Sequence, residues 1–215
     1  MKKILLIIVI LVFANVETNA QFNAGFRLGA NFCQIDGDKM SGYDLAGIVG
    51  GMFVSYPINS KWEGQFEMLF SQKGSEKPPD TTSSYASYNS STSGGSWNKL
   101  LINYIEVPVM VNYKVSKKIK LSGGLGGAFM ISNQYVSRNY LYENNVDFIT
   151  KGEFSGTVGV QYYFTPKFSA FCRFTYSLLG INAQGGAGAF YIYDGGLANN
   201  VISFGAYYAF LGNYK

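Results

Sequence analysis

Histidine is absent from the 215-residue sequence. Histidine is the general base of Ser-His and Asp-His catalytic arrangements, so hydrolytic sites of that kind are excluded. Carboxylates are present, but none has an obvious nucleophile as a partner. We therefore expect no enzymatic activity and no catalytic residue, and the residues indicate neither a cofactor nor a metal site.

Cysteine is scarce, with two residues in the whole sequence. Cys33 ends the first predicted strand and Cys172 lies in the seventh, and their side chains are predicted to face opposite ways. Two cysteines that point apart cannot be bridged without moving the backbone. We expect both to be unpaired packing residues.

A hydrophobic run of about 20 residues, which a transmembrane helix needs, is missing after residue 20. The N-terminus resembles a secretory signal peptide, with basic Lys2 and Lys3, an apolar run Ile4–Phe13, and small residues up to Ala20. An uncleaved anchor is the alternative, but about 10 apolar residues are too few to span a bilayer. We expect residues 1–20 to be removed during export and residues 21–215 to form one domain.

Charge is also sparse, because charged residues make up 14% of the sequence and the formal net charge is +4. This bias is too weak to indicate a nucleic-acid partner. Aromatic residues, at 17%, and 26 glycines are abundant. Such a composition fits a closed antiparallel sheet better than a helical bundle.

Eight segments alternate between apolar and polar residues with the period of a β-strand. Each is long enough to cross a bilayer, for which a tilted strand needs about 9 to 11 residues. The predicted strands are Phe22–Phe32, Tyr43–Tyr56, Lys61–Lys73, Leu101–Tyr113, Lys118–Ile131, Glu153–Phe164, Lys167–Leu179 and Val201–Phe210.

The connections between these segments alternate in length. Residues 57–60, 115–117 and 165–166 are short links, whereas residues 74–100, 132–152 and 180–200 are long. Outer-membrane barrels have short periplasmic turns and long outer loops. The sequence therefore predicts an all-β fold, an eight-stranded antiparallel up-and-down transmembrane β-barrel, with both ends of the chain in the periplasm.

The two faces of the last segment show which side of the wall meets lipid. One face is large and apolar, with Ile202, Phe204, Ala206, Tyr208 and Phe210; the other is mostly small or polar, with Val201, Ser203, Gly205, Tyr207 and Ala209. An eight-stranded lumen cannot hold that many aromatic side chains from every strand. We expect the apolar face to point outward into outer-membrane lipid, which disfavours the alternative of a soluble periplasmic ligand-binding barrel.

The inward face carries four basic and four acidic side chains. Strand order places Arg27, Glu67, Glu106 and Arg173 near mid-height, and places Glu63, Lys73, Lys120 and Glu153 at the periphery of this group. Buried charges are tolerated only when paired and hydrogen-bonded. We expect the four mid-height residues to form a salt-bridged plug; a small gated pore or transporter is the alternative.

Several motifs resemble the PorT-like family of small outer-membrane β-barrel proteins found in Bacteroidetes. The motifs are Gly25-Phe26-Arg27-Leu28-Gly29-Ala30-Asn31, Gly42-Tyr43-Asp44, Gly50-Gly51-Met52-Phe53, Phe66-Glu67 through Gln72-Lys73-Gly74, and Tyr104-Ile105-Glu106-Val107-Pro108-Val109. The resemblance covers nearly all of the chain after residue 20. We expect a non-enzymatic integral protein of the outer membrane with a structural or a surface-interaction role, and the resemblance implies a role accessory to protein secretion.

The C-terminal segment resembles the signal that the barrel-assembly machinery reads during biogenesis. That signal is a glycine followed by spaced hydrophobic positions ending in an aromatic residue, and Gly205, Tyr208 and Phe210 supply it. The resemblance implies a transient partner, the assembly machinery, during insertion.

The long connections mix tyrosine with small polar residues, a composition also found in antibody paratopes. The tyrosines are Tyr85, Tyr88, Tyr140, Tyr142, Tyr191 and Tyr193. A protein partner bound through these outer loops is one interpretation, and solvated loops without a ligand are the other. Asp36-Gly37-Asp38 is interpreted as a turn in preference to a calcium site.

Overall fold

The computed structural model describes residues 22–38, 40, 42–77, 98–137, 140–144, 149–182 and 196–211, so the predicted signal peptide lies outside the described residues. These residues contain nine strands. The strands are β1 (Asn23–Asp36), β2 (Leu45–Pro57), β3 (Trp62–Lys77), β4 (Asn98–Lys114), β5 (Ile119–Ser137), β6 (Tyr140–Asn144), β7 (Gly152–Tyr163), β8 (Phe168–Ser177) and β9 (Ala198–Leu211).

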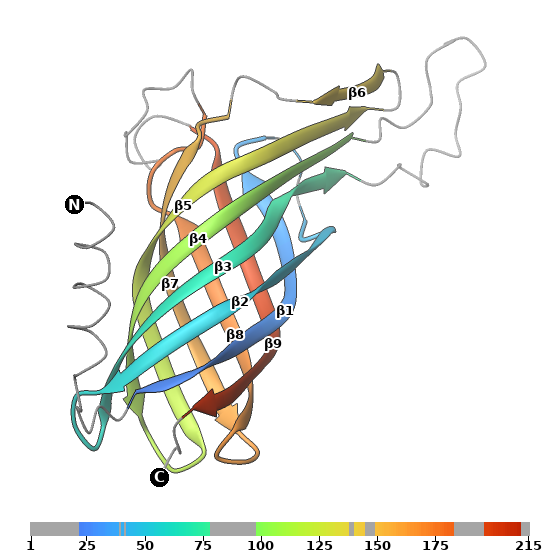
Figure 1. Ribbon diagram of the computed structural model, residues 1–215. Coiled ribbons are helices and arrows are strands. Elements are labelled where there is room, and N and C mark those ends of the chain that lie inside the picture. Colours follow the sequence, from blue (N-terminus) through green and yellow to red (C-terminus); the bar gives the residue numbers. More distant parts are fainter. Residues whose placement is uncertain are drawn as a thin grey trace, which may run out of the picture.

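Eight of these strands close into the predicted antiparallel barrel (Figure 1). Each pairs with its neighbour along the chain, except that β5 pairs with β7 across the short strand β6, and β9 pairs with β1. The strands lie at a steep tilt to the barrel axis in Figure 1, as closure of a sheet requires. The fold class predicted from the alternation of side chains is confirmed.

Strand β6 is the one element of the described chain that the sequence did not predict. It pairs with the end of β5 between Gln134 and Ser137, beyond Ile131, where the predicted strand ended. In Figure 1 these extensions rise above the barrel wall at the end with the long connections. Beyond the membrane neither face has to be apolar, so the alternation that marks the other strands is lost there.

The three short turns share one local design. Asn59, Ser116 and Thr165 each use a side-chain oxygen to accept hydrogen bonds from two backbone N–H groups two and three residues later, over 2.9–3.3 Å. Side chains of this kind satisfy turn donors that no strand partner reaches. The predicted short links are therefore tight and well determined by the local sequence.

The two faces of the wall have the predicted chemistry. Leu28 is 70% exposed and Phe210 50%, whereas Arg27 is 5% and Ser203 4% exposed. In β2 the glycines obscure the pattern in the sequence, but Met52 points outward and Phe53 inward. The wall is apolar outside and polar inside, as in outer-membrane barrels. Among the described residues there is no helix whose length and apolar character would let it cross a membrane.

The seam between β1 and β9 completes the barrel. Gly29 lies opposite Gly205, and a Cβ atom on Gly205 would stand 2.2 Å from the backbone oxygen of Leu28. Outside the wall the seam is bridged by two aromatic pairs, Phe26–Phe210 and Phe32–Phe204, with ring centroids 5.1 and 6.1 Å apart. The facing glycines inside and the aromatic pairs outside allow the two ends of the sheet to meet.

The glycines of β5 alternate between packed and open positions. A Cβ on Gly124 would stand 2.2 Å from the backbone oxygen of Val109, whereas a Cβ on Gly123 would meet no atom within 4 Å. The backbone of β4 therefore approaches Gly124 on one face of β5, while the other face is open at Gly123.

We predict that Gly124→Ala destabilises the barrel by about 1–3 kcal/mol, because the new methyl group overlaps the β4 backbone. Gly123→Ala adds the same methyl group one residue earlier and is the matched control, with an expected change within about 0.5 kcal/mol. Urea unfolding in lipid vesicles, followed by tryptophan fluorescence, measures both. Equal effects of the two substitutions would contradict the close approach.

Candidate functional site

The lumen holds the main constellation of charged side chains in the described part of the chain. Every second residue of a strand faces inward, so eight charged residues from β1, β3, β4, β5, β7 and β8 meet across a narrow interior. The inward charges are Arg27, Lys73, Lys120 and Arg173 with Glu63, Glu67, Glu106 and Glu153. They comprise four cations and four anions, which fits the rule that buried charges occur with partners.

Glu67 is the centre of the first charged layer. Its carboxylate accepts hydrogen bonds from Arg27 Nη1 at 2.9 Å, from Arg173 Nη1 and Nη2 at 2.9 and 2.8 Å, and from the Tyr207 hydroxyl at 2.7 Å. Gln65 also donates to it. Glu67 is 0% exposed, and both arginines are at most 5% exposed. One carboxylate thus joins strands β1, β3, β8 and β9 across the lumen.

Two aromatic rings hold the arginines in place. The guanidinium carbon of Arg27 lies 4.3 Å from the centroid of the Phe171 ring, and that of Arg173 lies 5.5 Å from the Tyr207 ring. The centroid of the Tyr207 ring lies 5.1 Å from that of Phe53 and 5.1 Å from that of Phe171. Aromatic faces attract cations, so they offset part of the repulsion between two arginines that share one carboxylate.

Lys73 is the centre of a second layer. Its ammonium lies 3.1 Å from both carboxylate oxygens of Glu153 and forms an ion pair with Glu106. The Ser177 hydroxyl donates to Glu153 over 2.7 Å. The lysine ammonium also lies 5.4 Å from the ring centroid of Tyr104.

A third layer lies toward the short turns. Lys120 and Glu63 form an ion pair of 3.0 Å, with both side chains at most 1% exposed. Asn112 donates to Glu63 over 3.2 Å and to Gln65 over 2.8 Å, and Gln65 in turn donates to Glu67. The first and third layers are therefore one continuous hydrogen-bond network.

The structure changes one predicted partnership. Arg27, Glu67 and Arg173 are in direct contact, as expected, but Glu106 pairs with Lys73, and Lys73 and Glu153 belong to a central layer and not to the periphery. Lys73 lies opposite Ile102, four residues along β4 from Glu106. The long lysine side chain spans that offset in a tilted sheet, which strand order alone does not reveal.

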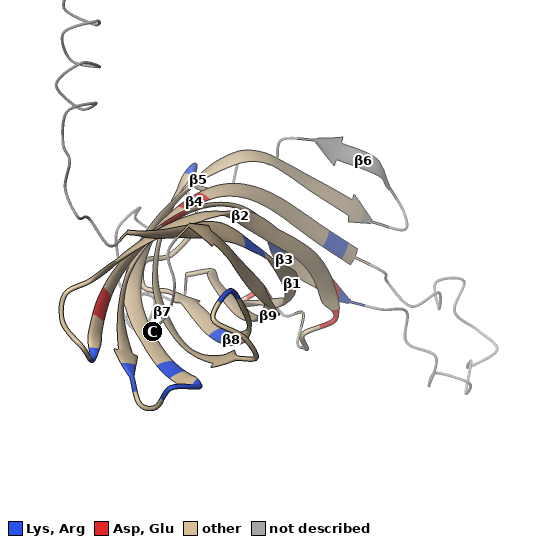
Figure 2. Ribbon diagram, turned by 60° about the horizontal axis from the view of Figure 1, so that its bottom comes forward, with Lys and Arg blue, Asp and Glu red and all other residues tan. Residues whose placement is uncertain are grey.

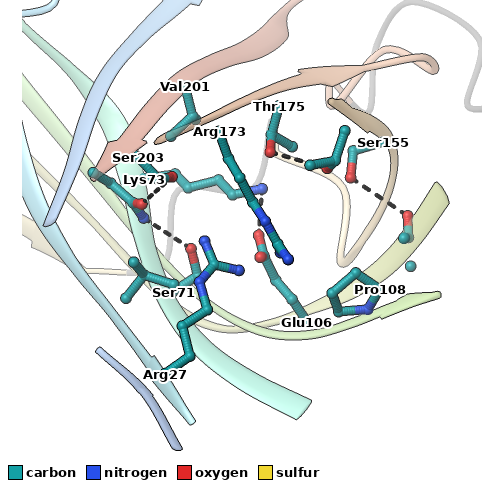
Figure 3. Close-up of a pocket in the computed structure, with 15 residues that line it drawn as sticks. Arg27, Ser71, Lys73, Glu106, Pro108, Ser155, Arg173, Thr175, Val201 and Ser203 are labelled. Atoms are coloured by element: carbon teal, nitrogen blue, oxygen red, sulfur yellow. Dashed lines mark hydrogen bonds and ion pairs between the residues drawn. The ribbon is translucent and has the colours of Figure 1, made fainter. Parts of the chain in front are cut away.

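A small polar cavity lies between the first layer, centred on Glu67, and the second layer, centred on Lys73 (Figure 3). Its volume is about 20 Å³, close to the space that one water molecule needs. Arg27, Lys73, Glu106 and Arg173 extend toward it in Figure 3, and Pro108 forms part of its wall. The pairing of β3 with β4 is interrupted between Phe66 and Leu69, beside Pro108. Pro108 has no N–H group to donate to the neighbouring strand.

An apolar cluster covers the lumen on the side of the long connections. Ile35 and Ile102 from the wall pack with Ile149 and Ile181, all at most 4% exposed. The backbone N–H of Thr150 donates to the carbonyl of Ile181 over 2.7 Å, so these two segments are tied together. We call this cluster the apolar cap. Together, the three charged layers and the apolar cap fill the part of the lumen that the described residues form.

Several residues of this site were missing from the predicted set. Tyr207, Gln65 and Asn112 connect the charged layers, and all three stand at inward positions in the alternation. That alternation is the signal that identifies them, because an inward polar group in a charged lumen needs a partner. The sequence does not say which partner it takes.

The remaining predicted residues lie on the wall or beyond it. Tyr208 and Phe210 are 51% and 50% exposed on the lipid face of β9, and Gly205 lies at the β1–β9 seam. Tyr140 and Tyr142 lie in β6, where the backbone is described. The other predicted loop tyrosines, Tyr85, Tyr88, Tyr191 and Tyr193, lie outside the described residues.

The Asp36–Asp38 segment is a turn. Gly37 has a φ of 98°, Asp36 accepts from Gln34 and Asn200, and Asp38 accepts from Ser75 and the backbone of Met40. Burial raises the pKa of Asp38 above its ordinary value, with Ser75 opposing the shift. Within the described ranges there is no group of three or more histidine, cysteine or acidic residues that could hold a metal ion. Cys33 and Cys172 are both free, as predicted.

We predict that Glu67→Gln lowers the free energy of unfolding by about 3–5 kcal/mol, because two buried arginines lose their shared carboxylate. Glu76→Gln is the matched control, since Glu76 pairs with Lys99 over 3.1 Å near the barrel rim, where the two side chains are 21% and 31% exposed. Loss of such a partly exposed pair costs up to about 1 kcal/mol. Urea unfolding midpoints compare the two, and a similar small loss in both would contradict the central role of Glu67.

Comparison with known proteins places the chain in a family. The family model described as an outer membrane protein beta-barrel domain matches residues 13–182. Among solved structures, Ail, the attachment invasion locus protein of Yersinia pestis, is 15% identical over 88% of this chain and 99% of its own, with a TM-score of 0.52. Neisserial surface protein A is 12% identical over 89% and 98%, with a TM-score of 0.47.

OprG from Pseudomonas aeruginosa is 10% identical over 90% of this chain and 97% of its own, with a TM-score of 0.36. No curated protein matches the sequence. The apolar outer face, the polar lumen and the family match agree on an outer-membrane location. The chain belongs to the outer membrane protein beta-barrel domain family.

Proposed function

We propose that this protein is a non-catalytic membrane anchor that acts through surface interactions of its long connections. The observation that carries the proposal is the filled lumen. Three charged layers and an apolar cap occupy it, and the cavity between the central layers has the volume of about one water molecule. An eight-stranded barrel has little interior space beyond its side chains, so the wall itself offers no path for a solute.

The long connections have a composition that is suited to binding a protein partner. Their sequences combine tyrosine with serine, glycine and asparagine, a mixture that gives rigid contact area together with adaptable hydrogen bonds. The resemblance to PorT-like proteins adds a finer proposal, in which the partner is a component of a secretion complex. Insertion by the barrel-assembly machinery through the β9 signal is part of the same proposal.

A gated pore is the second candidate, and the polar cavity is the observation that favours it. Glu106 lines that cavity, is 15% exposed and pairs with Lys73. A pore would also need Arg27 or Arg173 to change partners, because their layer blocks the lumen. The sealed lumen and the gated pore differ in one measurable property, the ion current.

We expect the purified protein to give no steady current in planar bilayers, and Glu106→Gln to leave that result unchanged, because the neighbouring layers still block the lumen. A general porin inserted into the same bilayer is the positive control. A steady current through the wild type that Glu106→Gln alters would contradict the sealed lumen and support the pore.

We expect photo-crosslinkers placed at Tyr85, Tyr140 and Tyr191 in living cells to yield adducts with one protein of the cell surface or of a secretion complex. Val115 is the control position, because it is 53% exposed at the opposite end of the barrel. Mass spectrometry identifies the adducts. Protein adducts at Val115 alone would place the functional surface in the periplasm and overturn the proposal.

A further inference from the structure

The short-turn end of the barrel is basic. Six lysines lie in or beside the three turns, and in Figure 2, where this end is turned forward, lysines mark the turns in blue. The lysines are Lys61, Lys114, Lys117, Lys118, Lys120 and Lys167. Glu63 is the sole carboxylate that the described residues contribute to this end, and it pairs with Lys120. The surplus of positive charge favours an anionic ligand.

A cleft of about 350 Å³ opens at this end between the β4–β5 and β7–β8 turns. This volume is within the range of sites for small molecules. Lys114, Lys117, Lys118 and Lys120 line one side, and Tyr163 to Pro166 line the other. The backbone N–H of Tyr163 donates to the carbonyl of Lys118 over 2.8 Å, so the two sides are fixed relative to each other.

The cleft also offers hydroxyl donors. Ser116 and Thr165 line it, and each hydroxyl oxygen accepts two backbone N–H groups of its own turn. Accepting these bonds fixes the oxygen and leaves the O–H hydrogen to be donated to a ligand. Ammonium groups and hydroxyl donors around one cleft are suited to a phosphate.

Aromatic side chains beside the cleft indicate the depth at which it lies. Phe164, which lines the cleft, is 59% exposed and stacks on Phe168, with ring centroids 5.7 Å apart; Tyr162 lies 5.3 Å from Phe164. Exposed aromatic residues at the end of a barrel strand belong to the girdle at the membrane–water interface. The lysines of the cleft therefore lie at the level of the lipid head groups.

We propose that this cleft binds the phosphate of an anionic phospholipid in the periplasmic leaflet. Lys114, Lys117 and Lys118 hold the phosphate together with the two hydroxyls, whereas Lys120 stays paired with Glu63. Phe164 and Pro166 contact the glycerol and the first methylene groups. A free phosphate ion would use the ammonium side and leave the apolar side unused. An extended acidic peptide would need a longer groove than this cleft between two turns.

The test is a titration of the purified full chain with phosphatidylglycerol, in which native mass spectrometry counts the bound lipids. We expect one lipid at saturation and affinity about tenfold lower in Lys117→Gln/Lys118→Gln, which removes two positive charges from the cleft. Lys61→Gln/Lys167→Gln removes the same charge from the same end, outside the cleft, and should stay within about twofold of wild type. Lys117→Arg/Lys118→Arg should retain binding.

Heat-modifiable gel mobility confirms that each variant is folded before titration. Equal weakening by the two glutamine variants, or no weakening by Lys117→Gln/Lys118→Gln, would show that the cleft is not a site. Displacement of the lipid by inorganic phosphate at matched concentration would assign the cleft to a free anion, and displacement by a polyglutamate peptide would assign it to an acidic protein. Either displacement would overturn the lipid proposal.

Discussion

Closure of the sheet between β1 and β9 is the constraint on which the rest of the structure depends. In lipid no water satisfies an unpaired backbone group, so an open sheet edge is not tolerated there. The facing glycines Gly29 and Gly205 allow the two strands to meet. Closure with eight strands then fixes a narrow interior, and every inward side chain must find its partner inside it.

The charged layers follow from that confinement. Glu67 satisfies two arginines, a tyrosine and a glutamine from four different strands, so that one carboxylate connects opposite sides of the barrel. Removing this carboxylate is costly, because the two arginines would stay buried without a charged partner. The lumen is thus a polar core, and the membrane takes the place that an apolar core has in a soluble protein.

Much of this fold was predictable because lipid imposes a strict alternation on each strand. Leu28 and Phe210 point outward and Arg27 and Glu67 inward, as the period of two requires. The turns at Ser116 and Thr165 also follow from local chemistry. Strand β6 was not predictable, because outside the membrane neither of its faces has to be apolar.

By itself, the sequence determined the barrel, the faces of its strands and the balanced set of lumen charges, because those depend on the order of residues along each strand. Only the tertiary structure decided that Glu106 pairs with Lys73 and that Tyr207 and Asn112 join the network. It also brought Lys118 and Tyr163 together at one cleft. Partners of this kind depend on the stagger and tilt of the strands and on side-chain reach, which appear once the sheet is closed.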